Sequence, residues 1–210
     1  MKESQSGWSY RLAPHLLLRD RPQTGTPPPE QVLVIHGGGA FPPGHPTTRL
    51  CLDLLREALA ADAVHRLADV GCGAGILALA AAALGVSLVV GVDISWPAAL
   101  ATRENARENG LAVSLKVVQG STAALRGPFD LVVANLPWEV QLDKVRELDR
   151  LAAARGRLIL SGFRDNQEAA LLAHYQQLGW TLTRRLLKEF WHPELPPDLS
   201  FTWVAWLLQP

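Results

Sequence analysis

The stretch Asp69-Val70-Gly71-Cys72-Gly73-Ala74-Gly75 joins an apolar run at 66–70 to an alanine-rich segment at 74–84. The first run is typical of a buried strand, and the second is typical of a buried helix. Glycines between a strand and a helix let the backbone turn sharply and let a ligand approach the main chain. The stretch therefore predicts a strand, a glycine-rich turn and a helix, with a ligand held at the turn.

Strand and helix patterns alternate along the rest of the chain, which predicts a mostly parallel sheet with helices on both faces. The expected helices are 48–61, 74–84, 97–109, 141–153 and 165–178, and the expected strands are 66–70, 88–92, 113–118, 129–134, 156–160, 180–187 and 201–208. No helix separates the last two strands, and parallel neighbours need a long crossover, so these two strands should form an antiparallel hairpin. We therefore expect a Rossmann-like, doubly wound α/β fold with a mostly parallel seven-stranded sheet and a C-terminal antiparallel hairpin.

The N-terminal part of the chain has a different composition. Residues 1–30 are polar and end in the run Pro27 to Pro29, which cannot continue a helix or a central strand. We predict a loosely ordered arm over 1–30 and one catalytic domain over 31–210, which begins with an edge strand at 32–35. The Gly- and Pro-rich loop that follows, 36–48, is typical of a lid or a binding loop.

Composition narrows the class of protein. The 210 residues are 48% hydrophobic. The 20 Lys and Arg residues are balanced by 20 Asp and Glu residues, and this neutral net charge argues against a long nucleic-acid partner. Cys51 and Cys72 have neither zinc-site nor disulfide spacing and are expected to be buried thiols of a reducing compartment. Because no window of about 20 residues is continuously apolar, we expect no membrane span and a cytoplasmic location.

A second acid, Asp93, ends the next strand, about 20 residues beyond the turn, where a carboxylate can bind ribose hydroxyls. The glycines follow a GxGxG pattern, not the GxGxxG of nicotinamide dehydrogenases. Asp69 would repel a pyrophosphate, but it suits the positively charged amino acid end of S-adenosyl-L-methionine. We predict this cofactor, with NAD or an unliganded turn as the alternatives. The expected contacts are Asp69, Gly71, Cys72, Gly73, Gly75, Asp93 and Ile94.

A second motif, Asn135-Leu136-Pro137-Trp138, directly follows the strand predicted at 129–134. Ligands of open α/β sheets bind outside the carboxyl ends of the strands, so this motif and the glycine-rich turn should face one crevice. The Asn135 side-chain oxygen and the Leu136 carbonyl can accept hydrogen bonds from an amine. Pro137 restricts the loop, and Trp138 offers an aromatic face to a base or a cation. The motif predicts methylation of a nitrogen; the alternative is a helix cap beside a core tryptophan.

These motifs together resemble class I adenosylmethionine-dependent methyltransferases, whose amino-methylating members carry [ND]PP[YFW]. A closer likeness is to the PrmA-type ribosomal-protein lysine methyltransferases, whose loop before the first core helix is roughly AFGTGxHPTT. Residues 40–52 (AFPPGHPTTRLCL) match that loop, and segments 101–106 and 156–162 are similar as well. The likeness covers about residues 32 to 208. It implies that Thr47 and Thr48 lie in a loop that closes over the methionine end of the cofactor. Asn135, which should face the same crevice, is expected to line the cofactor site as well as to contact the acceptor.

The chain also departs from the family pattern. Pro42 and Pro43 replace the usual Gly-Thr, and the family's segment after the fourth strand is NxxA-like rather than NLPW. Many class I enzymes place an acid after the third strand to bind the adenine amine, whereas Ser121 stands at this position. The family's N-terminal recognition domain has no counterpart in residues 1–30, which leaves room for a recruiting partner.

We therefore expect an enzyme that methylates a protein amino group, either a lysine or an N-terminus. The alternatives are a base amine of RNA or DNA, a small-molecule amine, and an inactive cofactor-binding subunit. A protonated lysine needs a base or a desolvated site to lose its proton, and Glu139 and His45 are the candidate bases. Trp203 and Trp206 should face opposite sides of the last strand, and Trp191 is a candidate for lining the cleft.

Overall fold

The computed structural model describes residues 7–20, 31–37, 42–190 and 201–210. The main sheet has seven strands in the order β6-β5-β4-β7-β8-β10-β9. Its strands are β4 (Arg66–Val70), β5 (Leu88–Asp93), β6 (Leu115–Gln119), β7 (Phe129–Asn135), β8 (Ala152–Arg164), β9 (Thr181–Phe190) and β10 (Phe201–Gln209). Strands β4 to β8 pair in parallel, and β10 is antiparallel to both β8 and β9. The predicted fold class, including the C-terminal antiparallel hairpin, is confirmed.

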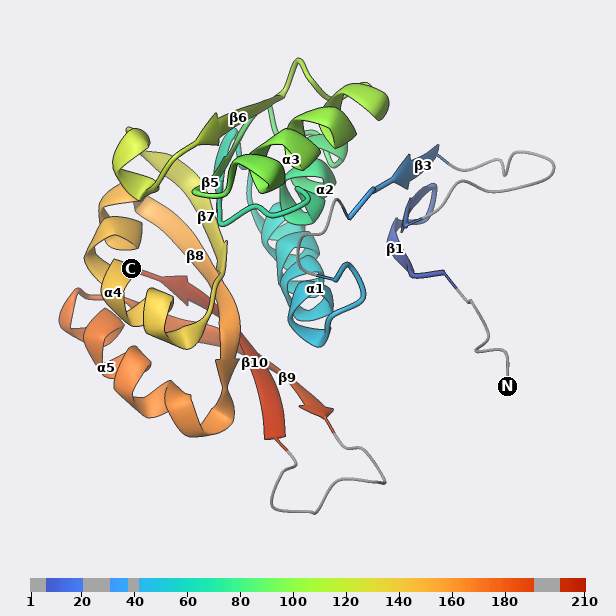
Figure 1. Ribbon diagram of the computed structural model, residues 1–210. Coiled ribbons are helices and arrows are strands. Elements are labelled where there is room, and N and C mark those ends of the chain that lie inside the picture. Colours follow the sequence, from blue (N-terminus) through green and yellow to red (C-terminus); the bar gives the residue numbers. More distant parts are fainter. Residues whose placement is uncertain (1–6, 21–30, 38–41, 191–200) are drawn as a thin grey trace.

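Helices cover both faces of the sheet (Figure 1). Helices α1 (Pro46–Ala61), α2 (Ile76–Ala83) and α3 (Trp96–Glu108) lie on one side, and α4 (Trp138–Leu151) and α5 (Glu168–Gln177) lie on the other. Two short 3₁₀ helices, η1 (Thr122–Ala124) and η2 (Asp165–Gln167), precede β7 and α5. Alternate residues of the central strands enter two apolar clusters: Leu131 and Val133 pack toward α1 and α2, while Val132 and Ala134 pack toward α4 and α5.

The N-terminal part departs from the expected loose arm. Strands β1 (Ser9–Ala13), β2 (Leu16–Arg19) and β3 (Gln31–Val34) form a separate three-stranded sheet, which lies beside α1, α2 and α3 (Figure 1). These residues form strands because apolar side chains alternate along them, a period of two. The alternate leucines Leu16 and Leu18 are buried in one cluster with α1 and α2. The expected edge strand at 32–35 corresponds to β3, which pairs with β2 alone. The proline run lies outside the described residues.

The last strand separates its two tryptophans as predicted. Trp206 is fully buried among the residues of α4 and α5, whereas Trp203 is half-buried and packs against the opposite cluster. Trp191 lies outside the described residues. Within the part of the chain that the structure describes, no helix combines the length and apolarity needed to cross a membrane.

Candidate active site

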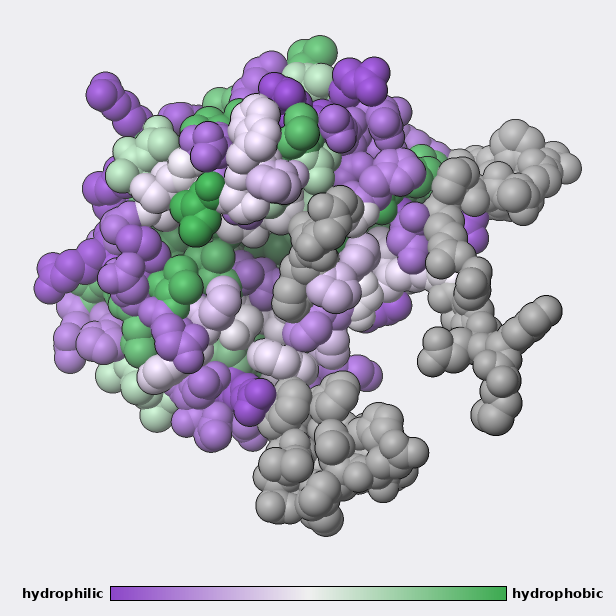
Figure 2. Space-filling view, in the orientation of Figure 1, coloured by the Kyte–Doolittle hydropathy of each residue, from purple (hydrophilic) through white to green (hydrophobic). Residues whose placement is uncertain are grey.

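A cavity of about 640 Å³ opens at the carboxyl ends of β4, β5 and β7. Figure 2 shows hydrophobic residues gathered around a hollow near the middle of the molecule. The structure brings together in the lining most of the residues predicted from sequence: Thr47, Thr48, Asp69, Gly71, Cys72, Gly73, Asp93, Ile94, Ser121, Asn135, Leu136 and Pro137. Gly75, Trp138 and Glu139 are not part of the lining. The cavity is of the size that small-molecule ligands occupy in proteins.

The glycine-rich turn is held by strand β5. The backbone N–H groups of Gly71 and Cys72 both donate to the Val92 carbonyl, at 2.8 and 3.1 Å. Gly71 has a φ of 72°, and an added Cβ atom would collide with the side chain of Leu136. The backbone conformation of the turn therefore favours glycine at this position, and the Leu136 side chain would have to move to make room for a Cβ atom.

Asp69 places a buried carboxyl group in the wall of the cavity. Its Oδ2 accepts the N–H of Ala78 at 3.0 Å, in the first turn of α2, whose N-cap residue Gly75 has no side chain. The pKa of Asp69 is raised from 3.8 to about 7, mainly by burial and to a smaller extent by the charge of Asp93. Asp69 makes no ion pair with the described residues. A positively charged ligand group beside it would favour the ionised form.

Asp93 uses both carboxylate oxygens to fix the backbone around the cavity. Oδ2 accepts the N–H of Gly73 and Oδ1 accepts the N–H of Ser95, each at 2.9 Å. A carboxylate has about four lone-pair sites, so each oxygen can accept a further hydrogen bond, for example from a ribose hydroxyl.

Thr47 and Thr48 differ from the expectation of a closing loop. Both are buried in the first turn of α1, which begins at Pro46 with His45 as the N-cap residue. Proline is favoured in a first turn because it has no N–H to satisfy. The two threonines thus line the cavity from a rigid helix start, and the preceding residues 38–41 lie outside the described part of the chain.

The surroundings of His45 and Glu139, the two candidate bases, do not favour either of them as a proton acceptor. The His45 Nδ1 atom accepts the N–H of Thr47 at 3.3 Å and lies 2.8 Å from its hydroxyl oxygen. Burial lowers the pKa of His45, which favours the neutral ring, and with Nδ1 as the acceptor of the Thr47 N–H the proton of that ring resides on Nε2. His45 is therefore poorly arranged to accept a proton from a substrate. Glu139 is exposed in the first turn of α4, where an acid complements the helix dipole.

The Asn135–Trp138 motif divides between the cavity and the core. The Asn135 side chain lines the cavity and has no hydrogen-bond partner among the described residues. The Leu136 N–H donates to the Ser161 carbonyl at 3.0 Å. The expectation that Trp138 offers an aromatic face to the acceptor is wrong: its Nε1 donates to the Gln167 carbonyl at 3.2 Å, and its ring packs on the core below α4. As the first residue of α4, Trp138 directs its side chain toward η2 and away from the cavity.

Two polar residues near the cavity were missed by sequence reasoning. Gln141 is fully buried, and its Nε2 donates to the carbonyls of Ala134 and Ser161, at 2.7 and 2.8 Å, so it ties together the ends of β7 and β8. Thr122 is buried in the lining, and its hydroxyl has no partner among the described residues. A glutamine on the apolar face of a predicted helix could have identified Gln141 from the sequence. No local pattern marks Thr122.

The neighbouring Ser121, which was expected to bind the adenine amine, has a local role. Its Oγ accepts the N–H of Ala123 at 3.3 Å and caps η1. Ser121 still lines the cavity, so its predicted contact with a cofactor stays a prediction.

The chain is similar to one protein family over most of its length. The family model described as ribosomal protein L11 methyltransferase (PrmA) matches residues 14–193. A protein of that name from Geobacter sulfurreducens is 38% identical over 184 residues, which is 84% of this chain and 60% of the relative. Another from Thermotoga neapolitana is 33% identical over 189 residues, covering 88% of this chain and 70% of the relative.

Solved structures show the same similarity. A crystal structure of ribosomal protein L11 methylase from Lactobacillus delbrueckii subsp. bulgaricus superposes with a TM-score of 0.76 and 26% identity. That superposition covers 96% of this chain and 97% of the solved one. By contrast, this chain spans only about 60% of the length of the Geobacter relative.

Proposed function

Because this chain belongs to the ribosomal protein L11 methyltransferase (PrmA) family, we propose that it transfers methyl groups from S-adenosyl-L-methionine to amino groups of a protein. The relatives are named for ribosomal protein L11, which makes L11 the first acceptor to test. One observation carries the proposal: a single cavity holds the buried carboxyl of Asp69, the oxygens of Asp93 and the amide of Asn135, which has no hydrogen-bond partner among the described residues.

The residues of the cavity fit this cofactor better than a dinucleotide. Asp69 is a buried carboxyl with a raised pKa, so a cationic group would stabilise its ionised form, whereas a pyrophosphate would be repelled. Asp69 would hold the ammonium group, Asp93 would accept the ribose hydroxyls, and the glycine-rich turn would lie against the methionine end. When bound, the cofactor supplies an electrophilic methyl group, so the protein needs no covalent nucleophile.

Asn135 would orient the acceptor. Its side-chain oxygen can accept an N–H of the acceptor amine and so direct the nitrogen lone pair toward the cofactor. The Leu136 carbonyl, expected to share this task, lies against Gly162, where an added Cβ atom would collide with it. We therefore assign the orienting contact to Asn135 first and to the Leu136 carbonyl second.

The acceptor amine must be neutral to react. A lysine with an ordinary pKa of ~10.4 needs roughly 4 to 5 kcal/mol to lose its proton at neutral pH. The cavity wall that follows Asn135 in the chain is apolar at Leu136, Pro137 and Val140, and Lys144 of α4 also lines the cavity. Burial against such a wall favours the neutral amine, so we propose that desolvation, and neither His45 nor Glu139, lowers this cost.

Cofactor class is tested first by calorimetric titration with adenosylmethionine, adenosylhomocysteine and NAD. The proposal expects micromolar-range binding of the first two and no binding of NAD. The Asp93→Ala variant should lose affinity for both ligands, and an unchanged affinity would remove Asp93 from the site. Binding of NAD alone would overturn the proposed cofactor.

Acceptor class is tested by incubating the protein with methyl-labelled adenosylmethionine and L11 from the same organism. We expect label on amino groups of L11, located by mass spectrometry. The Asn135→Ala variant should bind the cofactor normally but transfer no label. Label on RNA, or on small amines of a cell extract with none on L11, would replace the proposed acceptor.

A further inference from the structure

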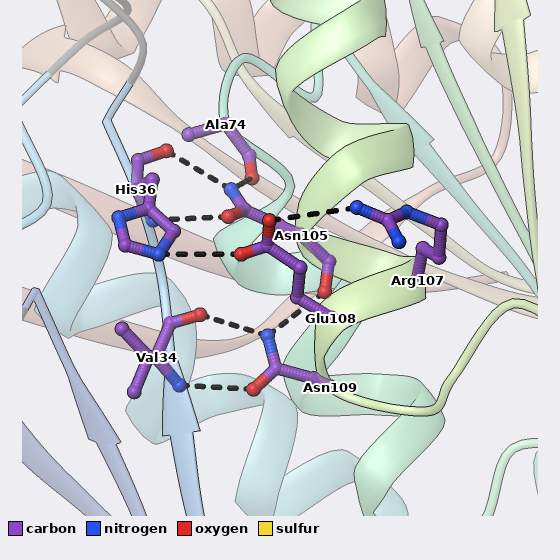
Figure 3. A network of polar contacts seen from close by, with 7 residues as sticks. All are labelled: Val34, His36, Ala74, Asn105, Arg107, Glu108 and Asn109. Carbon is purple, nitrogen blue, oxygen red and sulfur yellow. Dashed lines mark hydrogen bonds and ion pairs between the residues drawn. The ribbon is translucent and has the colours of Figure 1, made fainter. Parts of the chain in front are cut away.

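Two asparagines one turn apart, Asn105 of helix α3 and its C-cap residue Asn109, have amides that face the chain segment at 34–36 (Figure 3). Asn109 accepts the N–H of Val34 at 2.9 Å and donates to its carbonyl at 2.7 Å. Asn105 accepts the N–H of His36 and donates to its carbonyl, both at 3.0 Å. Four helical residues rise by about 6.0 Å and two strand residues by about 6.6 Å. The two amides therefore pair with alternate residues of this segment, Val34 and His36, as a neighbouring strand would.

Asn105 makes one more contact that Asn109 does not. Its Nδ2 also donates to the carbonyl of Ala74 in the glycine-rich turn, at 2.9 Å (Figure 3). Both amide hydrogens of Asn105 are thus committed, one to the segment at 34–36 and one to the turn. The third contact of Asn109 stays inside its own helix, with the Asn105 carbonyl at 2.8 Å. Asn105 is 1% exposed, so water cannot readily replace these bonds.

The contact with Ala74 completes a pair of braces from α3 to the turn. Thr102, one turn earlier on α3, donates its hydroxyl to the Gly73 carbonyl at 2.8 Å. In a trans peptide the C=O and the N–H point in opposite directions, so the N–H of Ala74 is directed away from α3. Ala74 lines the cavity, and its N–H has no partner among the described residues. The Thr102 brace therefore turns the peptide group between Gly73 and Ala74 so that its N–H points away from α3, while Asn105 holds the next peptide group, between Ala74 and Gly75.

We infer that Asn105 is a positioning residue of the candidate active site. Its amide binds the Ala74 carbonyl together with the N–H and the carbonyl of His36. These bonds hold the two segments in one arrangement and so keep the shape of the glycine-rich turn. Where the inference concerns the cofactor it rests on the proposed function, whereas the bracing of the turn does not. Asn109 is the matched control, because it contacts the same segment without touching the turn.

The bracing is tested by amide hydrogen exchange on the cofactor-free protein. In Asn105→Ala, the turn amides that are hydrogen-bonded within the fold, those of Gly71, Cys72 and Gly75, should exchange about tenfold faster. In Asn109→Ala they should stay within about twofold of the wild type, although both variants lose thermal stability. Equal exchange of the turn in both variants would overturn the inference.

A second variant covers the case in which Asn105→Ala does not fold. Asn105→Leu keeps nearly the volume of the side chain, so it leaves no cavity, but it lacks both donors and the acceptor and should release the turn in the same way. Unchanged exchange in this variant also contradicts the inference.

The link to the cofactor is tested by calorimetry with adenosylhomocysteine. We expect Asn105→Ala to weaken binding roughly tenfold and Asn109→Ala to leave it within about twofold. If the wild type binds and Asn105→Ala binds equally well, Asn105 does not position the site. If the wild type does not bind, the proposed function fails, and the exchange experiment alone decides whether Asn105 braces the turn.

Discussion

The carboxyl group of Asp69 combines a structural contact with a proposed binding role. One oxygen accepts an N–H of the first turn of α2, and the group also lines the cavity. Burial raises its pKa to about 7, so the fold keeps a carboxyl where its charge is unfavourable unless a cation is present. Such environments are typical of functional sites.

Asp69→Asn should remove a pH dependence of cofactor affinity. The amide oxygen can still accept the Ala78 N–H, so the variant loses the charge alone. Because an ammonium group favours the ionised carboxyl, adenosylhomocysteine should bind the wild type more tightly as pH rises from 5.5 to 7.5, by a factor on the order of ten. Calorimetry at both pH values should show weaker, flat binding in the variant. The same pH dependence in both proteins would assign it to another group.

The same variant should stabilise the cofactor-free protein at high pH. A raised pKa means that the contribution of Asp69 to stability is fully present below pH 3.8 and is lost as pH rises through about 7. Asp69→Asn does not lose this contribution. Thermal denaturation at pH 8 should therefore give it a free energy of unfolding higher than that of the wild type, by at most about 4 kcal/mol. At pH 4 the two should be similar. A variant that is less stable at pH 8 would show that the charge itself supports the fold.

The hydroxyl of Thr122 offers a third prediction at the scale of the residue. It is buried in the cavity lining and has no partner among the residues that the structure describes, whereas the Ser121 hydroxyl already caps η1. Thr122→Val keeps the shape of the side chain, so it should barely change the melting temperature but should weaken adenosylhomocysteine binding several-fold, roughly. Ser121→Ala should do the reverse. If calorimetry finds that Ser121→Ala is the more damaging to affinity, the sequence-based assignment of Ser121 is the better one.

At the scale of elements, the site depends on how β7 and β8 end side by side. Gln141 of α4 binds a carbonyl from each strand, and Gly162 lets β8 pass close to the Leu136 carbonyl. Gly162 has a φ of 99°, in the left-handed region that favours glycine. The two strands thus hold the segment that carries Asn135 at the edge of the cavity.

Gly162→Ala should displace this segment, and Gly85→Ala is its control. Gly85 has a similar φ of 96°, but an added Cβ atom there would meet nothing within 4 Å. Both variants should lose about 1 kcal/mol through backbone strain. Only Gly162→Ala adds a collision with the Leu136 carbonyl, so it should unfold at a lower temperature still and lose methyl transfer. Equal melting temperatures and equal activity in Gly162→Ala and Gly85→Ala would show that the backbone of β8 can move to make room for the added Cβ atom.

At the scale of the whole molecule, the N-terminal sheet shares a core with the catalytic fold. Leu18 of β2 is completely buried in the cluster that α1 and α2 form. The side chain of Tyr10 adds a polar tie, because its hydroxyl donates to Asp53 of α1 at 2.6 Å. These contacts predict that the sheet and the catalytic fold unfold together.

Leu18→Ala tests this unity. A large-to-small change in a packed core costs about 2 to 5 kcal/mol, and denaturant unfolding should show one transition with a lowered midpoint. Leu17→Ala, on the half-buried face of the same strand, should cost less. An unchanged midpoint in Leu18→Ala would mean that the N-terminal sheet is not part of the cooperative core.

Local patterns in the sequence were sufficient to determine the main sheet, the glycine-rich turn and the positions of Asp69, Asp93 and Asn135 at one edge. Periodicity identifies each element, and the rule that ligands bind at the carboxyl ends of parallel strands places these residues together. The same reasoning missed β1 and β2, since two short strands next to a proline run carry a weak signal.

Only the tertiary structure decided what each side chain meets. Trp138 packs on the core, and Thr122 rather than Ser121 has a hydroxyl without a partner among the described residues. The pKa of Asp69 is raised because the folded chain buries it. Asn105 reaches His36 across 69 residues of sequence. Sequence spacing sets which elements form, but burial and hydrogen bonding depend on residues that become neighbours only when the sheet and its helices have packed.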